Sequence, residues 1–82
     1  MADFKKVKVT NIEGVVEDID ASKIIGNLMY TQGQDVDVCE CGKKIYYGEV
    51  VELTEPQKAF IREKILPQLT YIFRVGVEQQ LM

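Results

Sequence analysis

Hydrophobic and polar residues alternate near the start of the chain. Over residues 4–10, apolar side chains and lysines follow one another closely enough to predict a β-strand with one solvated face. Residues 11–14, Asn-Ile-Glu-Gly, are typical of a turn, and residues 15–19 can return as an antiparallel partner. The beginning of the sequence therefore predicts a β-hairpin.

The apolar residues that follow recur with the spacing of a helix. Asp20 is a favourable N-cap because its carboxylate can accept hydrogen bonds from the free amides of a first helical turn. Gly33 is a natural stop for such a helix. Between these two positions one helical face is apolar: Ala21, Ile24, Ile25, Leu28 and Met29.

Residues 36–47 admit both a strand and a helix. As a strand, Val36 and Val38 would face one side while Cys39 and Cys41 face the other. As a helix, the segment has a single apolar stripe that consists of Val38, Cys41, Gly42, Ile45 and Tyr46.

Capping residues favour the helix, over about residues 37–47. Asp37 and Glu40 have the spacing of a capping box, and Gly48 is a suitable end. Gly42 costs such a helix about 1 kcal/mol relative to alanine, so the strand stays open as an alternative.

The second half of the chain predicts a short strand and then a helical region. Residues 49–53, Glu-Val-Val-Glu-Leu, are typical of a third strand that pairs with the hairpin. Thr54 and Gln57 form a capping-box pattern, with Pro56 in the first turn of the helix that follows. Pro67 should kink this helix or divide it in two, because proline lacks an N–H group and clashes with the preceding turn.

The last helical segment has apolar residues on two faces. One arc continues the stripe of the preceding helix: Ile61, Ile65, Leu69, Ile72, Phe73, Gly76 and Val77. Tyr71 and Val75 lie nearly opposite this arc, and Phe60 falls near them if the helix is continuous. Either the fold buries both faces, or Phe60, Tyr71 and Val75 bind a protein partner or a second copy of the chain.

Length and composition support one domain over residues 1–82. A chain of 82 residues with 46% hydrophobic and 28% charged residues can fold, but it cannot support two separate cores. We expect a small α+β domain in which the hairpin and a third short strand pack against three to four helices, the last region kinked by proline.

Charge and hydropathy limit the possible partners. The net charge of −3 and the absence of a long Lys/Arg run give nucleic-acid binding little electrostatic support. Tyr30, Tyr46 and Tyr47 could stack on bases, but we expect them to be core or rim aromatics. The chain has no stretch of 18 apolar residues and no apolar leader at its N-terminus, so we expect a cytoplasmic protein without a membrane partner.

The sequence also lacks the residues of most catalytic sites. There is no histidine, the single serine, Ser22, has no obvious base, and the six glycines are scattered. No calcium-binding loop pattern is present, and caps and turns explain the clustered acids: Glu17, Asp18, Asp20, Asp35, Asp37 and Glu40. We expect neither enzymatic activity nor a cofactor.

Cys39 and Cys41 are the residues that suggest another chemistry. As structural residues they would be two small, buried or half-buried thiols. A zinc site would need further ligands, from carboxylates such as Asp37 or from a second subunit. A redox role would need the strand conformation and an exposed thiolate near Lys43 or Lys44.

Three segments, which cover roughly half the chain, resemble a pattern found in small uncharacterised proteins of phages and prophage-like mobile elements. The segments are residues 20–30, Asp-Ala-Ser-Lys-Ile-Ile-Gly-Asn-Leu-Met-Tyr, residues 44–46, Lys-Ile-Tyr, and residues 48–54, Gly-Glu-Val-Val-Glu-Leu-Thr. The resemblance implies a small stand-alone protein of a mobile element and a helix around Tyr46. It carries no catalytic residues, and the Cys-Glu-Cys-Gly segment lies outside it.

Together these observations predict a non-enzymatic role in protein interaction or assembly, as an oligomer. One alternative is a thiol-based metal or redox protein that uses Cys39 and Cys41. The other is a small regulator that binds nucleic acid, which the run of short helices suggests.

Overall fold

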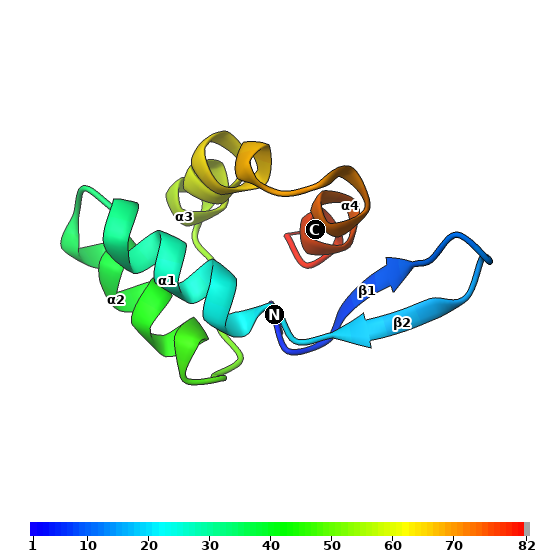
Figure 1. The fold of residues 1–82 in the computed structure, drawn as a ribbon. Coiled ribbons are helices and arrows are strands. Elements are labelled where there is room, and N and C mark those ends of the chain that lie inside the picture. Colours follow the sequence, from blue (N-terminus) through cyan, green and yellow to red (C-terminus); the bar gives the residue numbers. More distant parts are fainter. Residues whose placement is uncertain (82) are drawn as a thin grey trace.

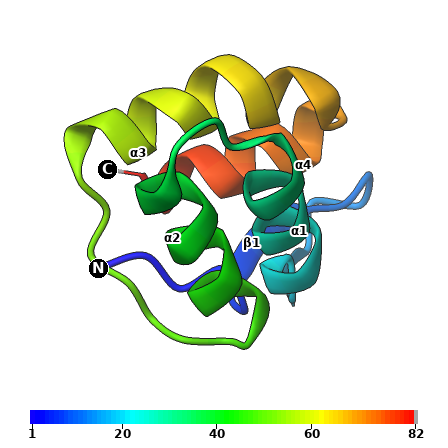
Figure 2. The ribbon, with the colours of Figure 1, turned by 90° about the vertical axis from the view of Figure 1, so that its left-hand side faces the viewer.

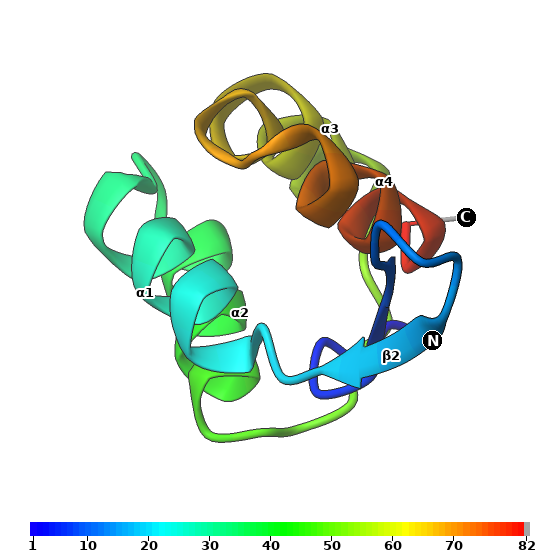
Figure 3. The same cartoon turned by 45° about the vertical axis from the view of Figure 1, so that its right-hand side comes forward.

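A pair of helices, a β-hairpin and a C-terminal helical region make up the computed structural model, which describes residues 1–81 (Figure 1). The helices α1 (Ser22–Gln32) and α2 (Val36–Tyr46) lie together at one end of the molecule, and the hairpin lies at the other. The C-terminal region spans the distance between them, as the turned view also shows (Figure 3). The expected α+β class is confirmed.

The hairpin consists of β1 (Val7–Thr10) and β2 (Val16–Ile19), which pair antiparallel. Asn11 holds the turn, because its side-chain oxygen accepts hydrogen bonds from the amides of Glu13, at 2.9 Å, and Val15, at 3.0 Å. Gly14 adopts a φ of 83°, which residues with a side chain rarely adopt. The predicted hairpin and its turn are both confirmed.

Helix α1 begins one residue later than expected. Its N-cap is Ala21 rather than Asp20, yet the Asp20 carboxylate still accepts hydrogen bonds from the Ser22 amide, at 3.0 Å, and the Ser22 hydroxyl, at 2.6 Å. These two bonds lower the pKa of Asp20. Ile25 is buried as predicted, whereas Ile24 is 49% exposed, so the apolar stripe is narrower than the sequence indicates.

Residues 36–46 form a helix, which settles the choice that the sequence left open. The predicted capping box at Asp37 and Glu40 is wrong. Asp35 caps the helix instead, because its carboxylate accepts a hydrogen bond from the Val38 amide at 2.9 Å. Gly48 follows the helix with a φ of 83°, as expected of a residue that ends one.

Helices α1 and α2 pack side by side, as the view onto this end of the molecule shows (Figure 2). Their close approach depends on two glycines. A Cβ atom on Gly26 would lie 2.5 Å from the Tyr46 nitrogen, and one on Gly42 would lie 2.8 Å from the Gly26 oxygen. Gly42, which weakens an isolated helix, is therefore what allows this helix to dock.

The predicted third strand does not form. Within residues 49–53, Val51 makes one isolated antiparallel bridge with Ala2, through backbone hydrogen bonds of 2.8 and 3.1 Å. The sheet in the described part of the chain thus consists of β1 and β2. Val51 and Leu53 are nevertheless buried, so the alternation in the sequence indicates an extended segment over the core rather than a strand of the sheet.

Helix α3 (Glu55–Phe60) starts at the predicted capping box. The Thr54 hydroxyl accepts a hydrogen bond from the Gln57 amide at 3.3 Å, and the Gln57 side chain accepts one from the Thr54 amide at 2.9 Å. The chain continues through a π-helical turn, η1 (Ile61–Ile65), and a 3-10 turn, η2 (Leu66–Gln68).

The C-terminal helical region then divides as predicted. Pro67 lies within η2, Leu69 and Thr70 are extended, and α4 (Tyr71–Gln79) begins anew. The core lies between the elements, and its largest fully buried side chains come from all parts of the chain: Phe4, Val7, Ile25, Met29, Ile45, Ile61, Ile65, Val77 and Leu81. None of the helices within residues 1–81 is long and apolar enough to cross a lipid bilayer.

Candidate interaction surfaces

Exposed apolar side chains gather on the outer face of α4. Tyr71 is 74% exposed and Val75 is 40% exposed, in line with their predicted position opposite the buried arc. Ile72 was expected in the buried arc but is 52% exposed, while Val77 is fully buried. The exposed face is therefore broader than the sequence indicates.

This face borders a groove of about 310 Å³ between α4 and the hairpin. We call it the α4–hairpin groove, and the residues that line it are Lys8, Thr10, Val16, Tyr71, Ile72, Val75 and Gln79. Val16 on β2 is itself 55% exposed. Helix and hairpin together thus present four apolar side chains to solvent.

Gly76 brings α4 onto β1 beside this groove. A Cβ atom at this position would collide with the carbonyl oxygen of Lys8 and lie 2.8 Å from a Val7 methyl group. The helix therefore covers β1 closely, on the side where Val7 and Val9 are buried. The outer strand β2 has no such cover, and Val16, Glu17 and Asp18 are all exposed.

Phe60 does not belong to the same surface. It lies at the end of α3, is half-buried and packs against the core. The sequence places it near Tyr71 and Val75 only if one continuous helix joins them, and the break at Leu69 and Thr70 removes that condition. Of the three candidate partner-binding residues, the structure brings together Tyr71 and Val75.

The two cysteines are free thiols in different surroundings. Cys39 is half-buried, with its sulfur 3.5 Å from the carbonyl oxygens of Tyr30 and Gly33. Cys41 is buried, and this burial raises the pKa of its thiol, an effect that nearby Lys44 partly offsets. A raised pKa lowers the thiolate fraction that redox chemistry or metal binding would use.

No group of three or more Cys, Asp or Glu side chains within residues 1–81 is placed to hold a metal ion. The acids of the sequence clusters are divided between sites. Asp20 and Asp35 accept hydrogen bonds at helix starts, and Asp18 pairs with Lys8 across the hairpin at 3.2 Å. Two helix starts and one surface pair thus account for three of the six clustered carboxylates.

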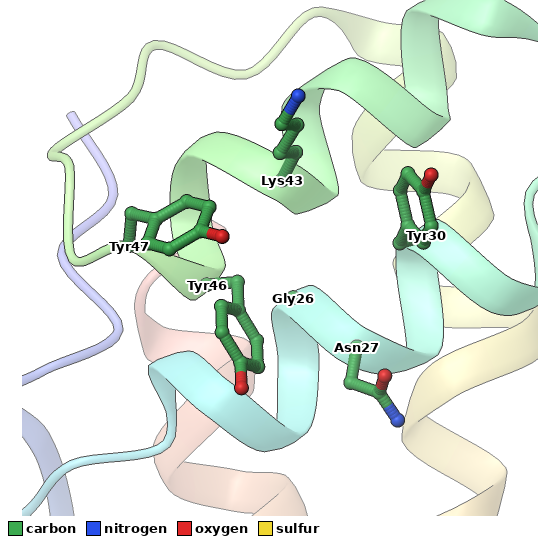
Figure 4. A pocket seen from close by; sticks show the side chains of 6 residues that line it. All are labelled: Gly26, Asn27, Tyr30, Lys43, Tyr46 and Tyr47. Carbon is green, nitrogen blue, oxygen red and sulfur yellow. The ribbon is translucent and has the colours of Figure 1, made fainter.

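A second groove lies between α1 and α2, with a volume of about 350 Å³ (Figure 4). We call it the tyrosine groove, and it is lined by Gly26, Asn27, Tyr30, Lys43, Tyr46 and Tyr47. Figure 4 shows Tyr46 and Tyr47 at one end of the groove and Tyr30 at the other, with Gly26 on the helix between them.

Aromatic and cationic contacts hold one end of the tyrosine groove. The rings of Tyr46 and Tyr47 meet edge to face, with their centroids 5.3 Å apart. The Lys23 ammonium lies 4.4 Å from the centroid of Tyr46. The sequence predicts separate core or rim tyrosines, because the position of Tyr30 relative to Tyr46 and Tyr47 depends on the packing of α1 against α2.

Comparison of the chain with protein-family models, with curated proteins and with solved structures found no match.

Proposed function

We propose that the protein has a non-enzymatic role in assembly, and that copies of the chain associate through the α4–hairpin groove. The observation that supports this is the set of four exposed apolar side chains, Val16, Tyr71, Ile72 and Val75, around one groove. Grouped apolar side chains on a small protein are a liability unless a partner covers them.

Charge favours association through this groove over pairing along the free edge of the hairpin. If two copies paired antiparallel through β2, Glu17 and Asp18 of each copy would lie close to the same carboxylates of the other. Like charges opposite one another destabilise a strand pair. The groove, in contrast, has one cation, Lys8, which already has Asp18 as a counter-ion, and its centre is apolar.

The proposal includes a setting. From the resemblance of residues 20–30, 44–46 and 48–54 to small uncharacterised phage and prophage proteins, we propose that the protein belongs to a mobile element and acts in the cytoplasm of a host cell. The α4–hairpin groove needs no cofactor or catalytic group for this role, because burial of apolar surface supplies the association energy.

A double substitution tests the proposal. Tyr71→Lys with Val75→Glu places two charges on the exposed face, so the fold should remain and the subunit count in native mass spectrometry should fall. The matched control is Val36→Lys with Val50→Glu, since these two residues are 75% and 45% exposed and do not line the groove. The control should keep the subunit count of the wild type.

Two results would contradict the proposal. One is a wild-type protein that sediments as a monomer at millimolar concentration. The other is a double variant that keeps its oligomer mass while circular dichroism shows an intact fold. A stoichiometric metal ion in the native mass spectrum of the wild type would instead favour the thiol-based alternative.

A further inference from the structure

We propose that the tyrosine groove binds an extended, proline-rich peptide segment that carries an acidic residue next to its prolines. This site is separate from the α4–hairpin groove, with which it shares no lining residue. The proposal rests on the chemistry of the lining and on the accessibility of its aromatic rings.

The lining is rich in hydrogen-bond donors. Three phenol hydroxyls, the Asn27 amide and the Lys43 ammonium surround the groove, and no carboxylate is among the described residues that line it. The groove is therefore suited to a ligand that presents acceptors.

A proline-rich segment is such a ligand. In the polyproline II conformation the backbone has no internal hydrogen bonds, so its carbonyl groups are free acceptors, and prolines bring no N–H group that needs a partner. The apolar pyrrolidine rings pack well on aromatic faces, which is how aromatic-lined grooves recognise such segments. Tyr30 and Tyr47 are 56% and 72% exposed, so their rings are accessible.

The shape of the groove also fits a linear chain. Gly26 lines the groove through its backbone, because the space where its side chain would lie is filled by the α2 backbone, and Tyr30 lies at the opposite end of the groove from Tyr46 and Tyr47 (Figure 4). An extended segment can lie along the groove with prolines against the exposed rings of Tyr30 and Tyr47, one at each end. The preformed conformation of the segment lowers the entropy lost on binding.

Lysines set the charge that the peptide should carry. Lys43 lines the groove, and Lys23 lies against Tyr46 at one end of it. An acidic residue next to the prolines can pair with one of these ammonium groups. Single-stranded nucleic acid is less suitable, because it needs a continuous basic channel and the protein has a net charge of −3.

Fluorescence anisotropy with a labelled octaproline peptide flanked by aspartates tests the proposal. We expect saturable binding, which weakens at least about tenfold in Tyr30→Ala and Tyr47→Ala because each removes an aromatic contact. Tyr71→Ala is the matched control, since Tyr71 is 74% exposed but lies outside the tyrosine groove. This variant should bind the peptide with the affinity of the wild type.

Two further measurements separate this proposal from others. Lys43→Glu should weaken the aspartate-flanked peptide more than a glutamine-flanked one. The Tyr71→Lys, Val75→Glu variant should bind the peptide normally, whether or not the proposed oligomer exists. Lack of binding to the peptide, equal affinity in the tyrosine variants that circular dichroism shows to be folded, or tighter binding of an oligothymidine than of the peptide would overturn the proposal.

Discussion

Two facing glycines, Gly26 and Gly42, determine how closely α1 and α2 approach. At this contact the nearest atoms to a Cβ on Gly26 would be backbone atoms of Tyr46 and Gly42, at 2.5 to 2.7 Å. Backbone atoms cannot rotate away as a flexible side chain can. The pair of helices therefore depends on the absence of two side chains, a requirement that does not follow from helix propensity.

Gly26→Ala should destabilise the protein by about 1 kcal/mol, as the net of two opposing effects. Alanine is the better helix former by about 1 kcal/mol, but overpacking against a rigid neighbour costs about 1 to 3 kcal/mol and here forces the helices apart. Urea unfolding followed by circular dichroism measures the change. Asn27→Ala, on the next residue, is the control and should change stability little; an equally stable Gly26→Ala would show that the helices are not in contact.

At the same scale, single side chains show what the sequence could indicate about the surfaces. The position of Tyr71 and Val75 opposite the buried arc follows from helical geometry, whereas their exposure does not, because the sequence also allows the fold to bury both faces. The prediction for Ile72 is wrong, because its burial depends on an element covering α4 from outside, and the short hairpin leaves it 52% exposed. The position of Phe60 depends on whether the helix is continuous, which the helical periodicity cannot determine.

Among the elements, local capping chemistry fixes where α3 begins. Thr54 and Gln57 exchange two hydrogen bonds, and the reciprocal pair satisfies amides that the first turn leaves free. Thr70 precedes α4 in the equivalent position, yet its side chain makes no capping hydrogen bond. The chain thus provides a matched pair of threonines.

Thr54→Ala should lower the free energy of unfolding by about 1 kcal/mol, because one amide loses its partner at the helix start. Thr70→Ala should change it by only a few tenths, since no capping bond is lost. Guanidinium unfolding of both variants and the wild type measures the difference. Equal losses in the two variants would mean that the capping box does not stabilise α3.

The elements that sequence reasoning predicted well are those with local causes. The hairpin turn at Asn11, the stop at Gly33 and the capping box at Thr54 each involve residues a few positions apart. The prediction of a third strand is wrong because strand pairing depends on residues far apart in the sequence. Val51 pairs with Ala2 at a single bridge, and the pairing does not extend to neighbouring residues. The π-helical turn η1 likewise depends on the fit of its buried residues to the core.

Across the whole molecule, the N-terminal residues 2–4 contact three other parts of the chain. Ala2 pairs with Val51, and the amide of Asp3 donates to the Gln80 side chain at 3.0 Å. The carbonyl of Phe4 accepts from the amide of Ala21 at 2.7 Å, next to the start of α1. In the view of Figure 1 the N-terminus lies between the helix pair and the hairpin, and the turned view of Figure 2 shows it at the edge of the molecule.

Phe4→Ala should therefore loosen the entire fold rather than one element. Phe4 is 2% exposed, and removing a buried phenylalanine costs about 4 kcal/mol, a large share of the 5 to 15 kcal/mol typical of domains. Phe4→Leu refills most of the space and should recover much of this loss. Hydrogen exchange distinguishes loosening of the whole fold from loosening of one element. Amide protection should fall together in β1, α1 and α4, whereas a loss confined to β1 would show that residues 2–4 do not couple these elements.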